Sequence, residues 1–123
     1  MAQEIAAAFE KVIDKQLLYT AFAPIASFLE ENCSRIDLTY KSNFINDVDH
    51  ATLLDFELIK IDNVTQENDT LVFRIVISAD VEIEETIHGD RQVDCVQKWL
   101  TLSCSANTDD ILGSFSIESI DAY

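Results

Sequence analysis

The sequence predicts an α+β fold, in which an amino-terminal helix packs on one face of a curved antiparallel sheet. Apolar residues in the first third recur every three or four positions, the spacing of a helix face. Residues 71–83 then alternate strictly, with an apolar residue at each odd position, as in a half-buried strand. A chain of 123 residues, 48% of them hydrophobic, suits one domain. We therefore assign a single domain to 1–123, helical over 2–32 and a sheet over 35–123.

The helical part carries two apolar stripes, one within 5–13 and the other within 18–29. Pro24 is the only proline in the chain. A proline at this position removes a backbone donor and crowds the carbonyl group of Thr20. We expect either one kinked helix or two helices with a joint between Thr20 and Pro24.

The rest of the chain predicts four longer strands and one short strand arranged as a meander. The short strand is expected at 36–40, followed by a polar connection at 41–52. The alternation over 53–64 changes parity between Leu58 and Ile59, which indicates a bulge. A turn is expected at 65–70, ahead of the long alternating strand. The closing strand is expected within 114–123, where Phe115 and Ile117 share a face.

The connection between the two central strands is predicted from Gly89. A two-residue type II′ turn favours glycine at its first central position. With Gly89 there, Ile83 faces Val96 and Ile77 faces Leu102, so that both strands present apolar residues to one face. A one-residue slip would turn one strand over, and this agreement therefore supports the pairing.

The charge of the chain argues against several partners. There are 23 acidic and 8 basic side chains, for a net charge of −15. Nucleic acids and anionic membranes bind mainly through Lys and Arg, so we expect neither as a partner. No segment approaches the roughly 20 apolar residues of a membrane span, and the first residues lack the pattern of a signal peptide. We expect a cytoplasmic protein whose acidic surface serves solubility or a basic partner.

Residues 80–95 look most like a reactive site, with six carboxylates, His88 and Cys95 around Gly89. Their spacing matches no calcium loop. The predicted pairing sets Glu85 opposite Asp94 at the hairpin end, and it sets Cys95 opposite Glu84, which disfavours a thiolate. These residues are therefore interpreted as the solvent face and tip of a hairpin.

Other chemistries lack their signatures. The two glycines cannot form a phosphate-binding loop or a dinucleotide fingerprint, and neither H-E-x-x-H nor G-x-S-x-G occurs. The three cysteines have no C-x-x-C spacing, which argues against a structural zinc site. His50 is expected to border a strand. We expect no catalytic residue, no cofactor and no metal site.

The strongest hint of an interaction surface is Trp99. The predicted pairing places it on the otherwise polar face of the sheet, with Val76, Asp80 and Glu82 on the same face. An exposed tryptophan commonly anchors a protein contact. The alternative is that another segment of the chain covers it.

Two resemblances extend these expectations. The order of a helix followed by a long antiparallel meander resembles the cystatin-like and nuclear-transport-factor-like folds, which implies a sheet that wraps the helix and encloses a ligand cavity. The carboxyl half, from VEIEET through QKWLTLSCSANTDD to FSIESIDAY, resembles accessory domains of bacterial mobile-element proteins. Some of those proteins continue into an ImmA-type zinc peptidase, but no activity is implied here because H-E-x-x-H is missing.

We expect a non-enzymatic protein-interaction or accessory module, bacterial and cytoplasmic. Two alternatives stay open. One is a small-molecule-binding or enzymatic cup between helix and sheet, which an inward-facing polar cluster would favour. The other is an acidic decoy protein for a basic partner, which carboxylates in rows on one face would favour.

Overall fold

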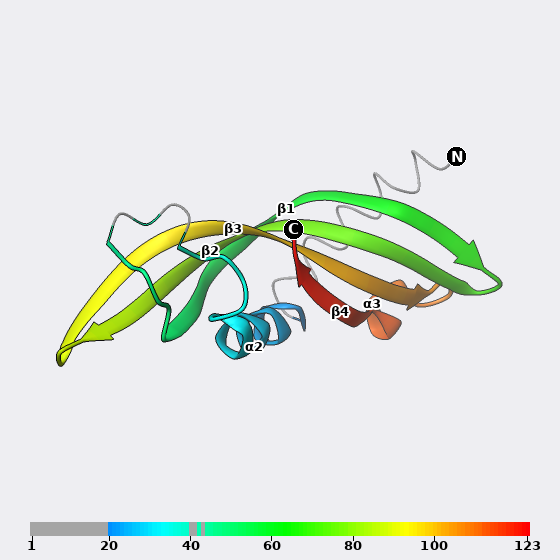
Figure 1. Ribbon diagram of the computed structural model, residues 1–123. Helices are drawn as coiled ribbons and strands as arrows, with labels where there is room; N and C mark the ends of the chain where they lie inside the picture. The colour runs from blue at the N-terminus through cyan, green and yellow to red at the C-terminus, as the bar shows by residue number, and fades with distance from the viewer. Residues whose placement is uncertain (1–19, 40–41, 43) are drawn as a thin grey trace.

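The computed structural model describes residues 20–39, 42 and 44–123 (Figure 1). In this part of the chain one longer helix is followed by four strands, which form an antiparallel sheet in the order β1-β2-β3-β4. The α+β class and the meander are thereby confirmed. The elements are α2 (Phe22–Asn32), β1 (His50–Glu67), β2 (Thr70–Ile87), β3 (Asp90–Asn107), α3 (Ile111–Ser114) and β4 (Ser116–Ala122).

The predicted short strand at 36–40 is wrong for Ile36–Thr39, which has no regular secondary structure, and Tyr40 lies outside the described residues. The sheet therefore starts at His50 and not near residue 35. The segment that precedes it is fixed by burial instead, since Leu38, Ile45 and Val48 are all buried. This also corrects the polar connection predicted at 41–52, because isolated apolar residues in a loop can belong to the core without any periodic pattern.

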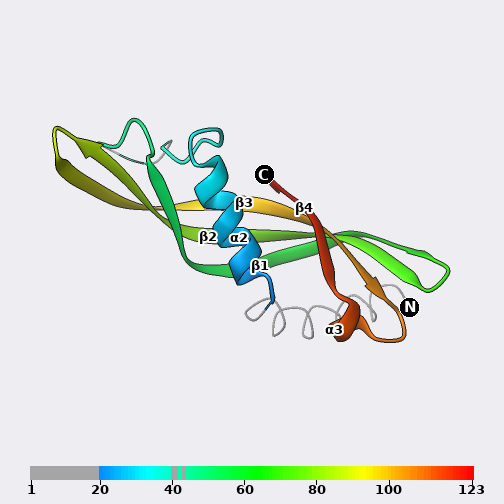
Figure 2. The same ribbon diagram turned by 90° about the horizontal axis from the view of Figure 1, so that it is seen from below.

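The sheet arches, and α2 lies under its concave face (Figures 1 and 2). Three residues of this helical region at four-residue spacing, Ala21, Ile25 and Leu29, are fully buried, and α2 contacts mainly β1. The concave face of the sheet supplies the other side of the core. Its largest fully buried side chains include Phe73, Ile75, Ile77, Ile83, Leu100 and Leu102.

Pro24 is the third residue of α2. In the first turn of a helix the backbone N–H groups have no partner within the helix, so a proline there costs no hydrogen bond. The amide of Ile25 donates to the carbonyl of Ala21 at 3.0 Å, and the helix continues from there. The first apolar stripe at 5–13, and with it the choice between a kinked helix and two helices, lies outside the described residues.

The β2–β3 hairpin has a different turn from the predicted one. Ile87 pairs with Asp90, so His88 and Gly89 form the two-residue loop. Both have positive φ, 52° and 85°, as in a type I′ turn. The predicted type II′ turn, with Gly89 in the first central position, is wrong.

This turn shifts the predicted pairing by two residues. Val96 faces Val81 rather than Ile83, and Leu102 faces Ile75 rather than Ile77. A shift of two leaves every side chain on its predicted face, so the alternation of apolar residues cannot detect it. Only the conformation of the turn distinguishes the two registers.

The bulge predicted between Leu58 and Ile59 is confirmed, since Leu58 pairs with Ile77 but Lys60 pairs with Val76. The strand has two further register shifts, within 53–55 and within 62–65. Bulges bend a strand and increase its twist, which suits the curvature of this sheet. β1 also runs on to Glu67, so the turn predicted at 65–70 shortens to two residues.

Candidate functional site

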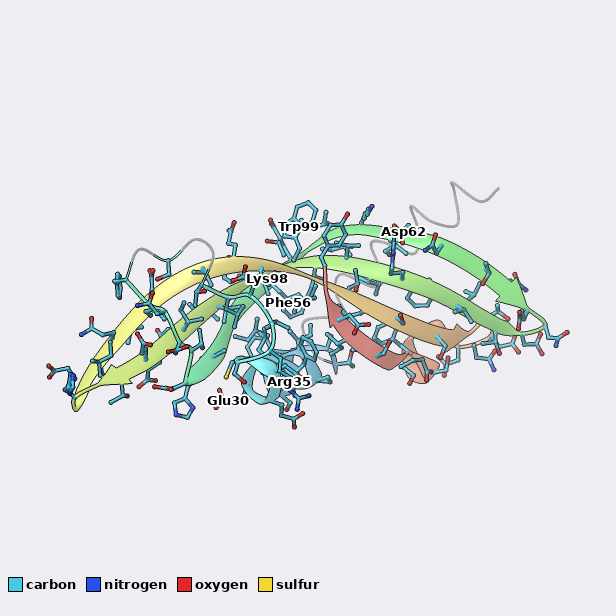
Figure 3. The ribbon with its side chains drawn as sticks, viewed as in Figure 1. Glu30, Arg35, Phe56, Asp62, Lys98 and Trp99 are labelled. Atoms are coloured by element: carbon cyan, nitrogen blue, oxygen red, sulfur yellow. The ribbon has the colours of Figure 1, made fainter. Side chains whose placement is uncertain are left out.

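Trp99 lies near the middle of the convex face, which is the face of the sheet turned away from α2 (Figure 3). Its relative exposure is 42%. The ring of Tyr123 meets it edge to face, with 5.3 Å between the centroids, and the Tyr123 amide donates to the Trp99 carbonyl at 2.9 Å. The two rings form an exposed aromatic pair on a face that is otherwise mostly polar.

Val76 shares this face with Trp99 but is fully buried. It pairs with Lys60 on one side and with Thr101 on the other. The prediction that Val76 forms part of the interaction surface is therefore corrected, because a fully buried side chain cannot contact a partner directly.

A group of charged residues lies further along the convex face. The Asp62 carboxylate accepts hydrogen bonds from Nε and Nη2 of Arg74, both at 2.7 Å, and Lys60 Nζ lies 3.4 Å from Asp62 Oδ2. The hydrogen bond from Arg74 is the main reason that the pKa of Asp62 is lowered. Two of the chain's cations are thus already paired with a carboxylate.

The structure separates the two predicted acidic residues of the surface. Glu82 lies 3.6 Å from Arg91, which also binds Glu84 at 2.5 Å, so Glu82 belongs to an ion-pair group toward the hairpin end. Asp80 faces Asp55 on β1 and Gln97 on β3. Gln97 is two residues from Trp99 on the same strand, which brings Asp80 close to the aromatic pair.

Asp80 borders a hollow of 170 Å³ on the convex face, which we call the acidic hollow. A second hollow of 440 Å³ shares Asp80 and Gln97 with it and is also bordered by the exposed Leu54 and Cys95. The acidic hollow is lined by Asp55, Phe56, Glu57, Ser78, Asp80 and Gln97.

Sequence reasoning missed Asp55, Glu57, Ser78 and Gln97 as members of a site. Counted from the turn after Glu67, the pairing of Asp55 with Asp80 depends on the register shifts within 62–65 and within 58–60. Alternation on β1 gives a signal for the second of these shifts but none for the first. Two aspartates that face each other across neighbouring strands would indicate a binding site, because like charges directly opposite one another destabilise a sheet.

The carboxylates of 80–95 do not gather into one site. Cys95 is exposed and faces Glu82 rather than Glu84, a consequence of the corrected register. Glu85 faces Gln92 rather than Asp94 and is buried, so the prediction that it lies at a solvated tip is wrong. Among the described residues no group of three or more His, Cys, Asp or Glu side chains is arranged to hold a metal ion.

Glu85 has a structural role in the loop before β1. Its carboxylate accepts hydrogen bonds from the amides of Asn46 at 3.4 Å and Asp47 at 2.8 Å. These bonds hold the loop against the sheet where Ile45 and Val48 enter the core. The hydrogen bonds from these two backbone amides thus explain why the Glu85 carboxylate can be buried.

His50 borders β1 as expected and links it to α2. Its Nδ1 lies 2.7 Å from Glu30 Oε1, and Glu30 Oε2 accepts the amide of Ala51 at 3.0 Å. The hydrogen bond to Glu30 raises the pKa of His50, and the same bond is the main reason that the pKa of Glu30 is lowered. His88 is exposed in the hairpin turn.

On the concave side, a hollow of 480 Å³ lies between α2 and β4. Phe28 of α2 contributes one wall, while Phe115 and Ile117 contribute the other. The only buried polar or charged residues among those described are Ser78 and Glu85. Ser78 lies on the convex face and Glu85 is held by the loop, so neither forms an inward-facing polar cluster.

Comparison with protein families, curated proteins and solved structures found no match to this chain. The resemblances to cystatin-like and nuclear-transport-factor-like folds and to mobile-element accessory domains therefore stay predictions. In the described part of the chain, no helix has both the length and the apolar character needed to cross a membrane.

Proposed function

We propose that the chain is a non-enzymatic protein-interaction module that binds its partner on the convex face, around Trp99. The observation that carries the proposal is the exposed pair of Trp99 and Tyr123 on the face opposite the helix. Large aromatic side chains dominate the energy of many protein contacts. The role we propose is that of an accessory module in the cytoplasm of a bacterium, as the resemblance implies.

The concave face supports this choice over a ligand-binding cup. A cup needs polar groups that converge on an enclosed space. Here α2 places Ile25 and Leu29 against the sheet, and the loop before β1 adds Ile45 and Val48. Apolar side chains thus fill much of the space under the arch, and the 480 Å³ hollow that remains between α2 and β4 is lined by no buried polar residue among those described.

One observation favours the acidic decoy as a second candidate. Asp55, Glu57 and Asp80 lie together on the convex face, next to the aromatic pair. A decoy that occupies a basic site would depend on many such charges, and its binding would weaken steeply as salt rises. An interaction anchored by Trp99 would lose far less of its affinity over the same range of salt.

The proposal is tested by partner capture with two matched variants. The wild-type chain, Trp99→Ala and Val72→Ala are immobilised and exposed to a lysate of the source organism, and the retained proteins are quantified by mass spectrometry. Val72 is an equally exposed apolar residue on β2, far from the aromatic pair. We expect a reproducible partner on the wild type and on Val72→Ala, reduced about tenfold or more on Trp99→Ala.

Two results would contradict the proposal. One is that Trp99→Ala retains the same proteins in the same amounts as the wild type. The other is that no protein is retained reproducibly while a panel of small molecules raises the melting temperature, which would favour the cup. The melting temperatures of both variants are measured first, so that a loss of binding is not mistaken for a loss of folding.

A further inference from the structure

The acidic hollow combines three carboxylates that have no cationic partner within the described part of the chain. Asp55 and Asp80 face each other across β1 and β2, and Glu57 lies two residues along from Asp55. None of the three forms an ion pair with another described residue, whereas Asp62, Glu82 and Glu84 are all paired with arginine. Like charges directly opposite in a sheet destabilise it, so a cation between them is favoured.

Ser78 supplies an independent observation at the same place. Only 6% of this residue is exposed, and it lines the acidic hollow between Glu57 and Trp99, its two partners in the sheet. Its side chain makes no hydrogen bond with any other described residue. No buried side-chain nitrogen or oxygen of the described residues lacks a partner, so the Ser78 hydroxyl keeps contact with solvent in the hollow, where it can accept a bond from a group that enters.

The size and layout of the hollow fit the end of a side chain. Its 170 Å³ is several times the roughly 30 Å³ that a water molecule occupies in the liquid. The carboxylates come from two strands and, as part of the described chain, are not grouped to hold a metal ion. A guanidinium, with five N–H donors in a plane, can reach acceptors spread in this way.

The surroundings indicate a protein segment rather than a small cation. The second hollow shares Asp80 and Gln97 with the first and is bordered by Leu54, which offers an apolar contact for a neighbouring residue. Trp99, opposite Ser78 on β3, presents a ring that attracts cations placed over its face. A net charge of −15 would also steer a basic segment toward the chain.

We propose that the acidic hollow receives an arginine or lysine side chain of a basic segment in a protein partner. This inference rests on the proposed function and adds the chemistry of the partner to it. Asp55, Glu57 and Asp80 neutralise the cation, Ser78 accepts one of its hydrogen bonds, and Trp99 packs beside it.

The test uses hexa-arginine as the probe and hexacitrulline, its neutral analogue, as the control peptide. Each is titrated into the ¹⁵N-labelled full chain and followed by NMR. We expect hexa-arginine to shift the amides of Asp55, Glu57, Ser78 and Asp80 and the indole of Trp99, and hexacitrulline to shift none of them. Shifts concentrated elsewhere on the chain would overturn the proposal.

Three variants separate the hollow from general electrostatic attraction. Asp55→Asn/Asp80→Asn is compared with Glu67→Gln/Asp90→Asn, which removes the same charge at exposed strand ends. We expect the first to weaken hexa-arginine binding about tenfold and the second by less than about threefold. Ser78→Ala, which changes no charge, is expected to weaken it about threefold. Equal losses in the two double variants would overturn the proposal, as would displacement of the peptide by calcium or magnesium at a lower ionic strength than is needed with sodium.

Failure of this inference is distinguishable from failure of the proposed function. If partner capture is lost with Trp99→Ala but unchanged with Asp55→Asn/Asp80→Asn, the convex face binds a protein and the acidic hollow takes no cation. If capture is unchanged with both, the proposed function fails as well.

Discussion

The rings of Trp99 and Tyr123 meet edge to face, with 5.3 Å between their centroids and 66° between their planes. The hydrogen bond from the Tyr123 amide to the Trp99 carbonyl holds the two residues side by side, where the end of β4 lies next to β3. A side chain that is already held in one orientation loses less entropy when a partner binds. The contact with Tyr123 therefore suits Trp99 to act as an anchor.

Replacing Tyr123 with alanine should change the environment of Trp99 without unfolding the protein. Trp99 is the only tryptophan, so intrinsic fluorescence reports on it alone. We expect the emission maximum to move to longer wavelength and the free energy of unfolding to fall by about 0.5–1.5 kcal/mol. Tyr123→Phe keeps the ring and should show neither change. An unchanged emission spectrum in Tyr123→Ala would mean that the two rings do not pack together.

The ion pair between Glu30 and His50 should make stability depend on pH. The raised pKa of His50 contributes stability that is complete below the ordinary value of 6.5 and is lost as pH rises through its folded-state value. The lowered pKa of Glu30 contributes stability that is complete above the ordinary value of 4.5 and is lost as pH falls through its folded-state value. Both contributions are therefore present between pH 4.5 and 6.5.

The measurement is urea unfolding of the wild type and His50→Gln across this range. We expect the difference between them to be largest within the window and to shrink on both sides of it. NMR titration of the His50 imidazole should give a pKa above 6.5, which Glu30→Gln returns toward 6.5. A difference in stability that does not vary with pH would argue against the pair in solution.

The three cysteines should differ sharply in reactivity. Cys95 is exposed, whereas Cys33 and Cys104 are buried. Burial, with a smaller effect of the Glu118 charge, raises the pKa of the Cys104 thiol to about 12, and burial is also the main reason that the pKa of Cys33 is raised. Since the thiolate is the reactive form, a thiol reagent should label one site quickly in the native protein. Cys95→Ser should remove this fast phase; its persistence would show that a buried cysteine is accessible.

Glu85 should be important for stability although it lies among surface carboxylates. Glu85→Ala removes the acceptor for the amides of Asn46 and Asp47 and loosens the loop that carries Ile45 and Val48. We expect a loss of about 1–3 kcal/mol in the free energy of unfolding, measured by urea denaturation. Glu85→Gln keeps one oxygen and should lose less. Equal and negligible effects of both substitutions would mean that the carboxylate does not hold the loop.

The features that a periodic pattern can express were predictable from the sequence. Strict alternation identified β2, and the change of parity at Leu58 and Ile59 identified a bulge in β1. The hairpin pairing was wrong by two residues because such a shift preserves the faces, and His88 gave no sign that it would adopt a positive φ. Asparagine before glycine is the usual signal for this turn.

The candidate site was only half predictable. Trp99 and Asp80 could be placed on one face by counting residues along the hairpin. The partners of Asp55 and Glu57 on β2 could not be predicted, because they depend on the shift of register within 62–65, which no apolar pattern marks. The burial of Val76 was also not predictable, since the alternation places it on a face that reads as polar and exposed.

The affinity of the captured partner for the wild type and for Trp99→Ala tests the central claim most directly. With Val72→Ala as the matched control, isothermal titration calorimetry gives the three dissociation constants at one salt concentration. An anchor residue typically contributes 2 kcal/mol or more, so we predict that Trp99→Ala raises the dissociation constant about thirtyfold or more and that Val72→Ala changes it by less than about threefold. Equal dissociation constants for all three proteins would contradict the claim that the convex face around Trp99 is the binding surface.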